Sequence, residues 1–367
     1  MRIPALPLPL PVARAVIGAR RRVLDLADAA VPGELALLAD VVFGLQKTKI
    51  AGVLVSSGLA DALGKDSRAP VDLARELGLD PAVTMRVVDA ALVSRLMRLV
   101  REGRASLTKV GAPLCRDHPK SIASWVAYYA NPDTAAAHAH LDAQLREGAE
   151  PSGYHRAFGK SLWEYFGDHP DVGATFADAM RQLTEFDLAG IVRTYPWPRR
   201  GIICDVAGGV GHMLAAILEH RPNARGILLD SPEVIEQADG FLRERGLADR
   251  IERRTGDLFG ELNARADVYT MKWILHDWSD DACRDILKRV RATMPPGSKV
   301  VTIDQHHESG RRNQTTTPMA DILMLVCCEG GRERSPQEVQ GLMRDAGLTP
   351  GRVRHIGLTM LVEGIAP

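Results

Sequence analysis

The stretch GIICDVAGGVG, residues 201–211, decides the fold of the second half of the chain. Its apolar run up to Asp205 predicts the end of a buried strand. The glycines that follow allow the backbone to turn sharply and to come close to a ligand before a helix begins at Val210. A strand, a glycine-rich turn and a helix in this order place the N-terminus of the helix against that ligand.

Short apolar runs alternate with amphipathic helices after the segment Pro196-Trp197-Pro198. Strands that alternate with helices in this way form parallel sheets covered on both faces. The expected fold class is therefore α/β. The apolar runs that predict its strands cover residues 202–206, 226–229, 251–254, 268–273 and 300–304.

Three acidic residues, Asp205, Asp230 and Asp257, stand at the ends of three consecutive predicted strands. A dinucleotide fingerprint would need a third glycine where Leu214 stands, so pyrophosphate binding is disfavoured. A carboxylate at 205 repels phosphate but can pair with an amino group, and one at 230 can accept hydrogen bonds from both ribose hydroxyls. With Leu258 beside Asp257, where an adenine can lie, these acids predict a site for S-adenosylmethionine.

A histidine follows the fourth predicted strand, in the sequence MKWILHDWSD of residues 271–280. His276 therefore lies at the carboxyl edge of the predicted sheet, where open α/β folds bind ligands. Ser279 or Asp280 then caps a helix that we expect to run to Arg291. Taken alone, the histidine has a plainer explanation, as a residue hydrogen-bonded within its loop.

The first third of the chain has a helical pattern. Residues 70–81 predict a helix, a glycine-containing turn and the start of a second helix, and residues 99–108 suit a hairpin that turns at Glu102-Gly103. Helices followed by such a hairpin are typical of a winged helix. We expect an N-terminal arm over residues 1–34, a winged-helix domain over 35–115, a helical substrate-pocket segment over 116–195 and the α/β domain over 196–367.

The chain resembles the small-molecule O-methyltransferases, which include plant caffeate and flavonoid enzymes and bacterial enzymes that tailor polyketides and phenazines. The resemblance covers residues 35–365 and implies a Rossmann-like methyltransferase domain that uses S-adenosylmethionine. It also implies an intertwined homodimer formed through the winged-helix domain. Five ordered motifs carry it: residues 205–211, LDSPEV at 229–234, GDLF at 256–259, MKWILHDWSD at 271–280 and GGRERS at 330–335.

By this resemblance His276 is the general base, and two acids, Asp304 and Glu333, flank it. The family more usually has glutamate at 304, so either Asp304 still reaches the imidazole or Glu333 orients it alone. A neutral imidazole with a pKa near neutrality can take the hydroxyl proton while a carboxylate on its other nitrogen stabilises the resulting cation. Methyl transfer is then an in-line displacement in a dry site, with S-adenosylhomocysteine as the product.

The resemblance also implies binding residues. Ala207 stands where the family usually has the first glycine of the turn, and we expect it to be tolerated if its φ is negative. Outside the family, Lys272 and Trp278 would be explained as a surface lysine and a core tryptophan. The implied cofactor-binding residues are Asp205, Gly208, Gly209, Gly211, Asp230, Asp257, Leu258, Lys272 and Trp278. The implied substrate-binding residues are Phe176, Met180, Asp321 and Met324.

Composition disfavours several other classes of protein. Lys+Arg and Asp+Glu both number 46, so no bulk field would gather nucleic acid or an anionic membrane. The cysteines form no CxxC pair and no zinc-type cluster, and the adjacent His306 and His307 point to opposite sides of an extended segment, so no metal is expected. The same cysteine pattern argues against a disulfide framework and favours a reducing cytoplasm, and no run approaches the roughly 18 apolar residues of a spanning helix.

Two other interpretations stay open. A winged helix also occurs in transcription regulators, here joined to a ligand-sensing domain, although the apolar surface over residues 82–96 is too broad for a helix that reads a DNA groove. An enzyme of the same fold can instead methylate nitrogen or carry out chemistry without methyl transfer. Under the preferred interpretation, the substrate is a small and aromatic hydroxylated molecule that the sequence does not identify.

Overall fold

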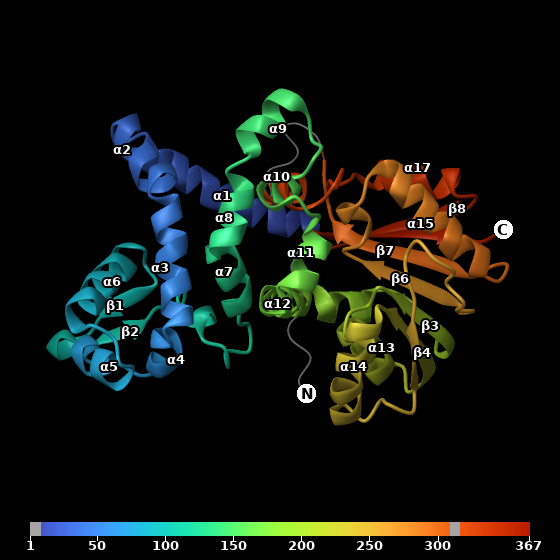
Figure 1. The fold of residues 1–367 in the computed structure, drawn as a ribbon, viewed down its shortest axis with the longest axis horizontal. Coiled ribbons are helices and arrows are strands. Elements are labelled where there is room, and N and C mark those ends of the chain that lie inside the picture. Colours follow the sequence, from blue (N-terminus) through green and yellow to red (C-terminus); the bar gives the residue numbers. More distant parts are fainter. Residues whose placement is uncertain (1–8, 309–315) are drawn as a thin grey trace. The chain divides into compact units, whose positions relative to one another are not determined.

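A computed structural model describes residues 9–308 and 316–367 (Figure 1). The chain divides into two compact units. The sheet unit comprises the described residues up to Ala19, then His140–Leu162 and Phe186–Pro367, and the helical unit comprises Arg20–Ala139 and Trp163–Glu185. Helices α1 (Leu10–Asp28) and α12 (Pro170–Thr194) contribute residues to both units. Residues 1–8 of the expected arm lie outside the described part.

A seven-stranded sheet with the order β5-β4-β3-β6-β7-β9-β8 forms the centre of the sheet unit. Strands β3 to β7 pair in parallel and contain the five apolar runs, which confirms the α/β prediction. Strands β9 and β8 close the sheet in antiparallel pairs that the sequence patterns missed. The strands are β3 (Arg200–Val206), β4 (Asn223–Asp230), β5 (Ile251–Thr255), β6 (Val268–Lys272), β7 (Lys299–Gln305), β8 (Thr349–Ile356) and β9 (Thr359–Ile365).

Helices cover both faces of this sheet, as Figure 1 shows. Helices α13 (His212–His220) and α14 (Pro232–Glu244) bury Leu214 and Leu242 in one apolar core with Ile203 of β3. Helices α15 (Asp280–Thr293) and α17 (Pro336–Asp345) bury Ile286 and Met343 in a second core on the other face. The unit is completed by α9 (Leu141–Glu147), α10 (Gly153–Phe158), α11 (Leu162–Asp168, in part) and α16 (Thr317–Cys327).

The helical unit contains the winged-helix elements. Helix α5 (Pro70–Glu76) leads to α6 (Pro81–Val93), whose first turn is capped where the Asp80 carboxylate accepts a hydrogen bond from the Val83 amide. The hairpin of β1 (Met97–Leu99) and β2 (Ala105–Leu107) follows, and its turn has positive φ at Glu102 and Gly103, as expected. The remaining helices are α2 (Gly33–Leu37), α3 (Gly44–Ser56), α4 (Leu59–Leu63), α7 (Ala123–Ala130) and α8 (Pro132–His138).

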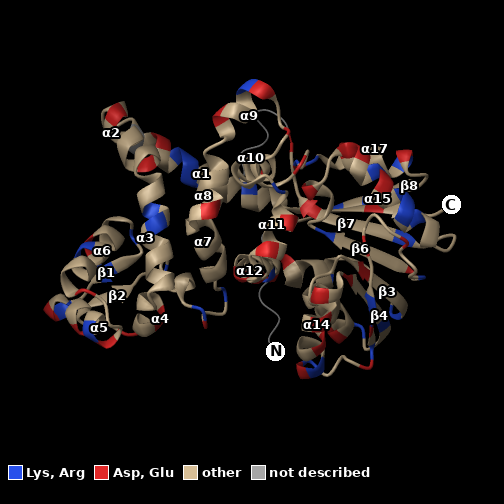
Figure 2. Ribbon diagram, viewed as in Figure 1, with Lys and Arg blue, Asp and Glu red and all other residues tan. Residues whose placement is uncertain are grey.

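The second helix of the helix-turn-helix carries little charge. Arg86 and Asp89 are the charged residues of α6, and Figure 2 shows the rest of this helix uncharged. Phosphate contacts from Lys and Arg supply most of the affinity of DNA-binding helices, so α6 is poorly equipped to bind DNA. In the part of the chain that the structure describes, no helix combines the length and the apolar character needed to cross a membrane.

Candidate active site

The glycine-rich turn after β3 is built around Asp205, which is almost fully buried. One carboxylate oxygen of Asp205 accepts a hydrogen bond of 2.6 Å from the Thr270 hydroxyl, and the other has no partner among the described residues. Burial raises the pKa of Asp205 to about 7. A Cβ on Gly208 would lie 2.7 Å from the Asp205 carboxyl carbon and from Leu228 Cδ1. Only glycine leaves the space beside this carboxylate open.

Several residues of this turn have a left-handed backbone conformation, with positive φ. Gly209 and Gly211 have φ of 60° and 85°, which glycine adopts without strain. Ala207 has φ of 52°, so the condition under which we expected it to be tolerated, a negative φ, is not met. The correction has a steric cause, because an L side chain in this region of φ meets the following carbonyl oxygen. The turn therefore carries strain at Ala207.

The substitution Ala207→Gly is expected to raise the free energy of unfolding by about 0.5–1 kcal/mol, because glycine removes the steric cost of a positive φ. Urea denaturation of the protein without cofactor measures this difference. The matched control is Ala216→Gly within α13, where glycine should lower the free energy of unfolding by about 1 kcal/mol. Destabilisation at both positions would contradict the strain assigned to Ala207.

The next two strands bring Asp230 and the GDLF motif toward this turn. The Asp230 carboxylate accepts hydrogen bonds from the amides of Gly209 (2.7 Å) and Ser231 (2.8 Å), and burial raises the pKa of Asp230. The bond from the Gly209 amide connects the glycine-rich turn to the end of β4. Asp257, by contrast, is exposed and accepts a hydrogen bond from the Phe259 amide.

An apolar wall stands beside Asp257. Leu258 and Trp278 are half-buried and pack against the same core, and the ring of Phe259 meets that of Trp278 edge-on with centroids 4.8 Å apart. The structure thus brings together the two segments, residues 256–259 and 271–280, that the sequence placed at an adenine. A flat apolar base fits such a wall.

Lys272 ends β6 with a buried side chain, so it is not a surface lysine. Its ammonium lies 3.7 Å from the Asp187 carboxylate and 3.0 Å from the centroid of the Trp273 ring. Burial lowers the pKa of Lys272 to about 8, against the opposing effect of Asp187, Asp304 and Asp205. Asp187 also accepts a hydrogen bond from the Thr359 hydroxyl at 2.8 Å. The helical pattern of residues 116–195 contains no signal that singles out Asp187.

His276 lies in a short 3₁₀ turn, Leu275–Asp277, just after β6. Its Nδ1 is 3.0 Å from Oε1 of Glu333, a buried residue, and its Nε2 is 3.5 Å from Oδ1 of Asp277. Burial lowers the pKa of His276, but the charges of Glu333, Asp277 and Asp304 outweigh it and raise the pKa to about 10. The expected pKa near neutrality is therefore wrong, because Glu333 and Asp304 as well as the neighbouring Asp277 lie close to the ring.

Asp304 lies near the end of β7 with 3% of its surface exposed. Neither of its carboxylate oxygens has a hydrogen-bond partner among the described residues, so Glu333 is the acid that hydrogen-bonds His276. Asp304 and His276 nonetheless line one small cavity together with Leu275, Arg332, Arg334 and Val339. Burial raises the pKa of Asp304 to about 7. The aspartate side chain is shorter than the glutamate usual in this position, and Asp304 lies close to His276 without a hydrogen bond to it.

This shift in pKa predicts how Asp304 affects stability with pH. Because burial raises the pKa of Asp304, folding favours the neutral form, and that contribution to stability is lost as the pH rises through about 7. Asp304→Asn should therefore gain stability relative to the wild type as the pH rises from about 4, near the ordinary pKa of 3.8, to about 7, by up to about 4 kcal/mol, with no further change above that range. Denaturation across this range checks the slope, with Asp281→Asn at an exposed position as the control. Equal slopes for both variants would contradict the burial of an ionisable Asp304.

The four residues expected to bind substrate lie in both units. In the sheet unit, Asp321 accepts a hydrogen bond of 2.8 Å from the Glu333 amide, and Met324 is buried on the same helix, α16. In the helical unit, Phe176 and Met180 are half-buried on α12. The ring of Phe176 packs in an aromatic cluster with Tyr128, Trp163 and Phe166.

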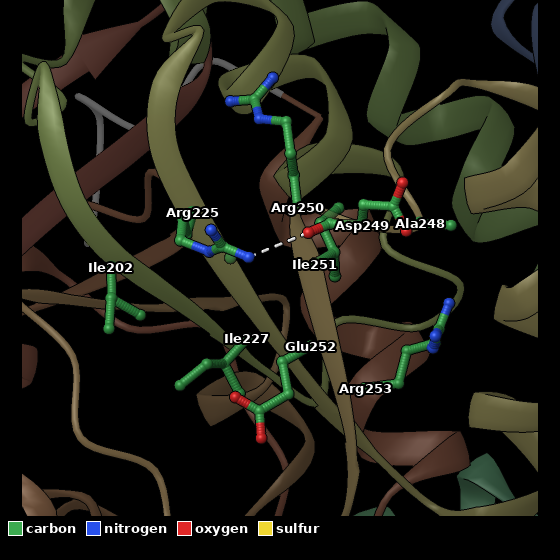
Figure 3. Close-up of a pocket in the computed structure, with 10 residues that line it drawn as sticks. Ile202, Arg225, Ile227, Ala248, Asp249, Arg250, Ile251, Glu252 and Arg253 are labelled. Carbon is green, nitrogen blue, oxygen red and sulfur yellow. Dashed lines mark hydrogen bonds between the residues drawn. The ribbon is translucent and has the colours of Figure 1, made fainter.

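One pocket and one cluster of possible metal ligands lie apart from these residues. Figure 3 shows an open pocket whose lining includes Ile202, Arg225, Asp249 and Arg250, at the amino-terminal ends of β3 to β5, and none of the expected site residues line it. In the helical unit, Asp61, Cys115 and Asp117 come close enough to hold a metal ion. However, Arg116 pairs with Asp61, and burial raises the pKa of the Cys115 thiol, which disfavours the thiolate that binds metals.

The residues at the strand ends fit a cationic amino acid joined to a nucleoside. Asp205 offers a buried carboxylate oxygen without a hydrogen-bond partner in the described part of the chain, and Gly208 keeps the approach to that oxygen open. Burying an unpaired acid costs free energy that a bound ammonium group offsets. The residues present therefore suit S-adenosylmethionine.

Comparisons with known proteins agree with this arrangement. Residues 138–349 match a family model described as an O-methyltransferase domain. O-demethylpuromycin-O-methyltransferase of Streptomyces alboniger is 31% identical over 363 residues, which are 96% of this chain and 93% of the relative. The 8-amino-8-demethylriboflavin N,N-dimethyltransferase of Streptomyces davaonensis is 29% identical over 82% of this chain and 86% of its own. The crystal structure of CalO1, a methyltransferase in calicheamicin biosynthesis bound to S-adenosylhomocysteine, has a TM-score of 0.76 and 27% identity over 91% of this chain and 98% of its own.

Proposed function

Since this chain belongs to the O-methyltransferase family and is an S-adenosylmethionine-dependent enzyme, we propose that its acceptor is a hydroxyl of a small aromatic molecule and that His276 is the general base. The contact of His276 Nδ1 with the buried Glu333, at 3.0 Å, carries this proposal. It fixes the orientation of the ring and leaves Nε2 as the atom that takes the hydroxyl proton.

The raised pKa of His276 fits this role once a cationic donor shares the site. A base must be neutral to accept a proton, and a pKa of about 10 keeps the imidazole protonated at neutral pH. A second positive charge nearby disfavours the imidazolium and lowers its pKa. Glu333 and Asp277 then stabilise the cation that forms when Nε2 receives the proton.

The binding roles follow the geometry of the turn. Asp205 would pair with the ammonium group of the donor, Asp230 would accept hydrogen bonds from its ribose hydroxyls, and Leu258 and Trp278 would enclose its adenine. When bound, S-adenosylmethionine supplies a methyl group that forms a bond to the acceptor oxygen as its bond to sulfur breaks, leaving S-adenosylhomocysteine. The chain itself aligns the acceptor, excludes water and receives the proton.

We further propose that the chain works as a homodimer. The segment from α2 to the start of α3 carries seven large apolar side chains that are each at least 43% exposed in the single chain: Leu35, Leu37, Leu38, Val41, Val42, Phe43 and Leu45. Such a concentration of exposed apolar side chains is typical of a surface that another chain covers. Because the family forms dimers through this part of the chain, the partner we propose is a second copy.

Mass spectrometry after incubation with methyl-labelled S-adenosylmethionine and a panel of phenols and aminophenols tests the activity. A product heavier by one methyl group, formed on oxygen, supports the proposal. Labelling of nitrogen alone would favour the second candidate, N-methylation, which a relative's name documents for that relative. Light scattering tests the assembly, and a mass near the 39.9 kDa of one chain, rather than twice that value, would contradict the dimer.

A further inference from the structure

The loop that carries His276 is held by a buried arginine from the GGRERS segment. Arg334 has 2% of its surface exposed. Its Nη1 donates to the carbonyl oxygen of Leu275, and its Nη2 donates to that of Trp278 at 2.7 Å. These two carbonyls lie on either side of His276. One planar guanidinium thus spans the turn from the residue before the base to the tryptophan beyond it.

An ion pair anchors the same guanidinium. Nε of Arg334 donates to Oδ1 of Asp280 at 2.9 Å, in the first turn of α15. Burial would raise the pKa of Asp280, but hydrogen bonds from Arg334 and Arg332 hold it below its ordinary value. Arg334 therefore connects the base-bearing turn and the start of α15 through one buried side chain.

Glu333 and Arg334 act on the turn from adjacent positions. Glu333 bonds the side chain of His276, whereas Arg334 bonds the backbone just before it. The two glycines of the segment allow this close approach. A Cβ on Gly331 would lie 2.8 Å from the His276 carbonyl oxygen, and a Cβ on Gly330 would lie 2.8 Å from Ser279 Cβ. The backbone of the GGRERS segment therefore packs closely against the turn that carries His276.

We propose that Arg334 is a positioning residue that sets the place of both His276 and Trp278, and so couples the base to the wall of the cofactor site. This inference rests on the proposed function of His276. Arginine suits the position because its rigid fork reaches carbonyl oxygens on both sides of the turn, whereas the single ammonium of lysine does not. A displaced base also loses its contact with Glu333.

The test compares Arg334→Lys with Arg284→Lys, a matched change on α15. Arg284 pairs with the exposed carboxylates of Asp281 and Asp345. For Arg334→Lys we expect kcat to fall by about 100-fold, the cost of misplacing a catalytic group by about an ångström, and hydrogen exchange of residues 275–279 to rise. Arg284→Lys should change neither by more than about 3-fold, because exposed ion pairs contribute little.

Two further readouts separate positioning from general stability. The acidic limb of the kcat/KM profile should move to lower pH in Arg334→Lys, because a His276 freed from Glu333 keeps less of its raised pKa, while Asp277 and Asp304 stay nearby. Millimolar guanidinium should restore part of the turnover of Arg334→Ala but none of that of His276→Ala. An unmoved profile together with no rescue would overturn the inference.

Failure of the proposed function is distinguishable from failure of this inference. Hydrogen exchange of the turn and the affinity for S-adenosylhomocysteine, reported by Trp278, need no turnover. If the wild type methylates no hydroxyl, the proposed function fails, while a loosened turn in Arg334→Lys still supports the positioning role. If exchange and affinity match those of Arg284→Lys, Arg334 does not hold the turn.

Discussion

Replacing His276 with alanine should cut turnover by roughly 100-fold or more, the scale of general base catalysis, and leave the affinity for S-adenosylhomocysteine within about 3-fold. The two effects separate because Nε2 of His276 is proposed to act on the acceptor hydroxyl, whereas the acids proposed to bind the cofactor lie on β3 and β4. Steady-state kinetics and isothermal titration calorimetry measure the two quantities on the same protein.

The stability of this variant needs its own control. Without the imidazole, Glu333 becomes a buried carboxyl group without its hydrogen-bond partner, which takes up a proton or destabilises the fold. Thermal unfolding shows whether the variant is folded at the assay temperature. His220→Ala, at an exposed position on α13, should retain full activity. A His276→Ala protein that folds and turns over at the wild-type rate would remove His276 from the mechanism.

The sequence alone could predict the parallel strands β3 to β7 and the acids at the ends of β3 and β4. In a parallel sheet the carboxyl ends meet at one edge, so Asp205 and Asp230 had to come close once the strands were identified. In the structure the Gly209 amide, in the turn that follows Asp205, donates a hydrogen bond to Asp230. The choice of an enzyme over a transcription regulator is likewise confirmed, by the family match and the named relatives.

Features that depend on distant residues could not be predicted in the same way. The pKa of His276 reflects its neighbour Asp277 and two acids far away in the sequence, Glu333 and Asp304, and Asp304 acts by proximity rather than by a hydrogen bond. The pairing of Lys272 with Asp187 joins a strand to a helix whose pattern carries no sign of it. The positive φ of Ala207 is a backbone property that its residue type disfavours.

The second large effect is expected at Gly208, where alanine should weaken binding of S-adenosylhomocysteine by about 100-fold or more, equivalent to about 2.7 kcal/mol. The added Cβ would lie 2.7 Å from the carboxyl carbon and one oxygen of Asp205 and from Leu228 Cδ1. Neither neighbour can move cheaply. Asp205 is buried and held by Thr270 at 2.6 Å, and Leu228 is fully buried in the core of β4. The clash can therefore be relieved only if the turn moves or if the Asp205 carboxylate, which is proposed to bind the ammonium group, moves.

A matched glycine separates this clash from a general effect of alanine. A Cβ on Gly240, within α14, meets no atom within 4 Å, so Gly240→Ala should keep the affinity and stabilise the helix by about 1 kcal/mol. Calorimetry with S-adenosylhomocysteine compares the two variants, and thermal unfolding checks that Gly208→Ala is folded. Binding by folded Gly208→Ala within about 3-fold of the wild type would mean that the ligand does not approach Asp205, since the added methyl group occupies that path. The cofactor site would then have to be placed elsewhere along the strand ends.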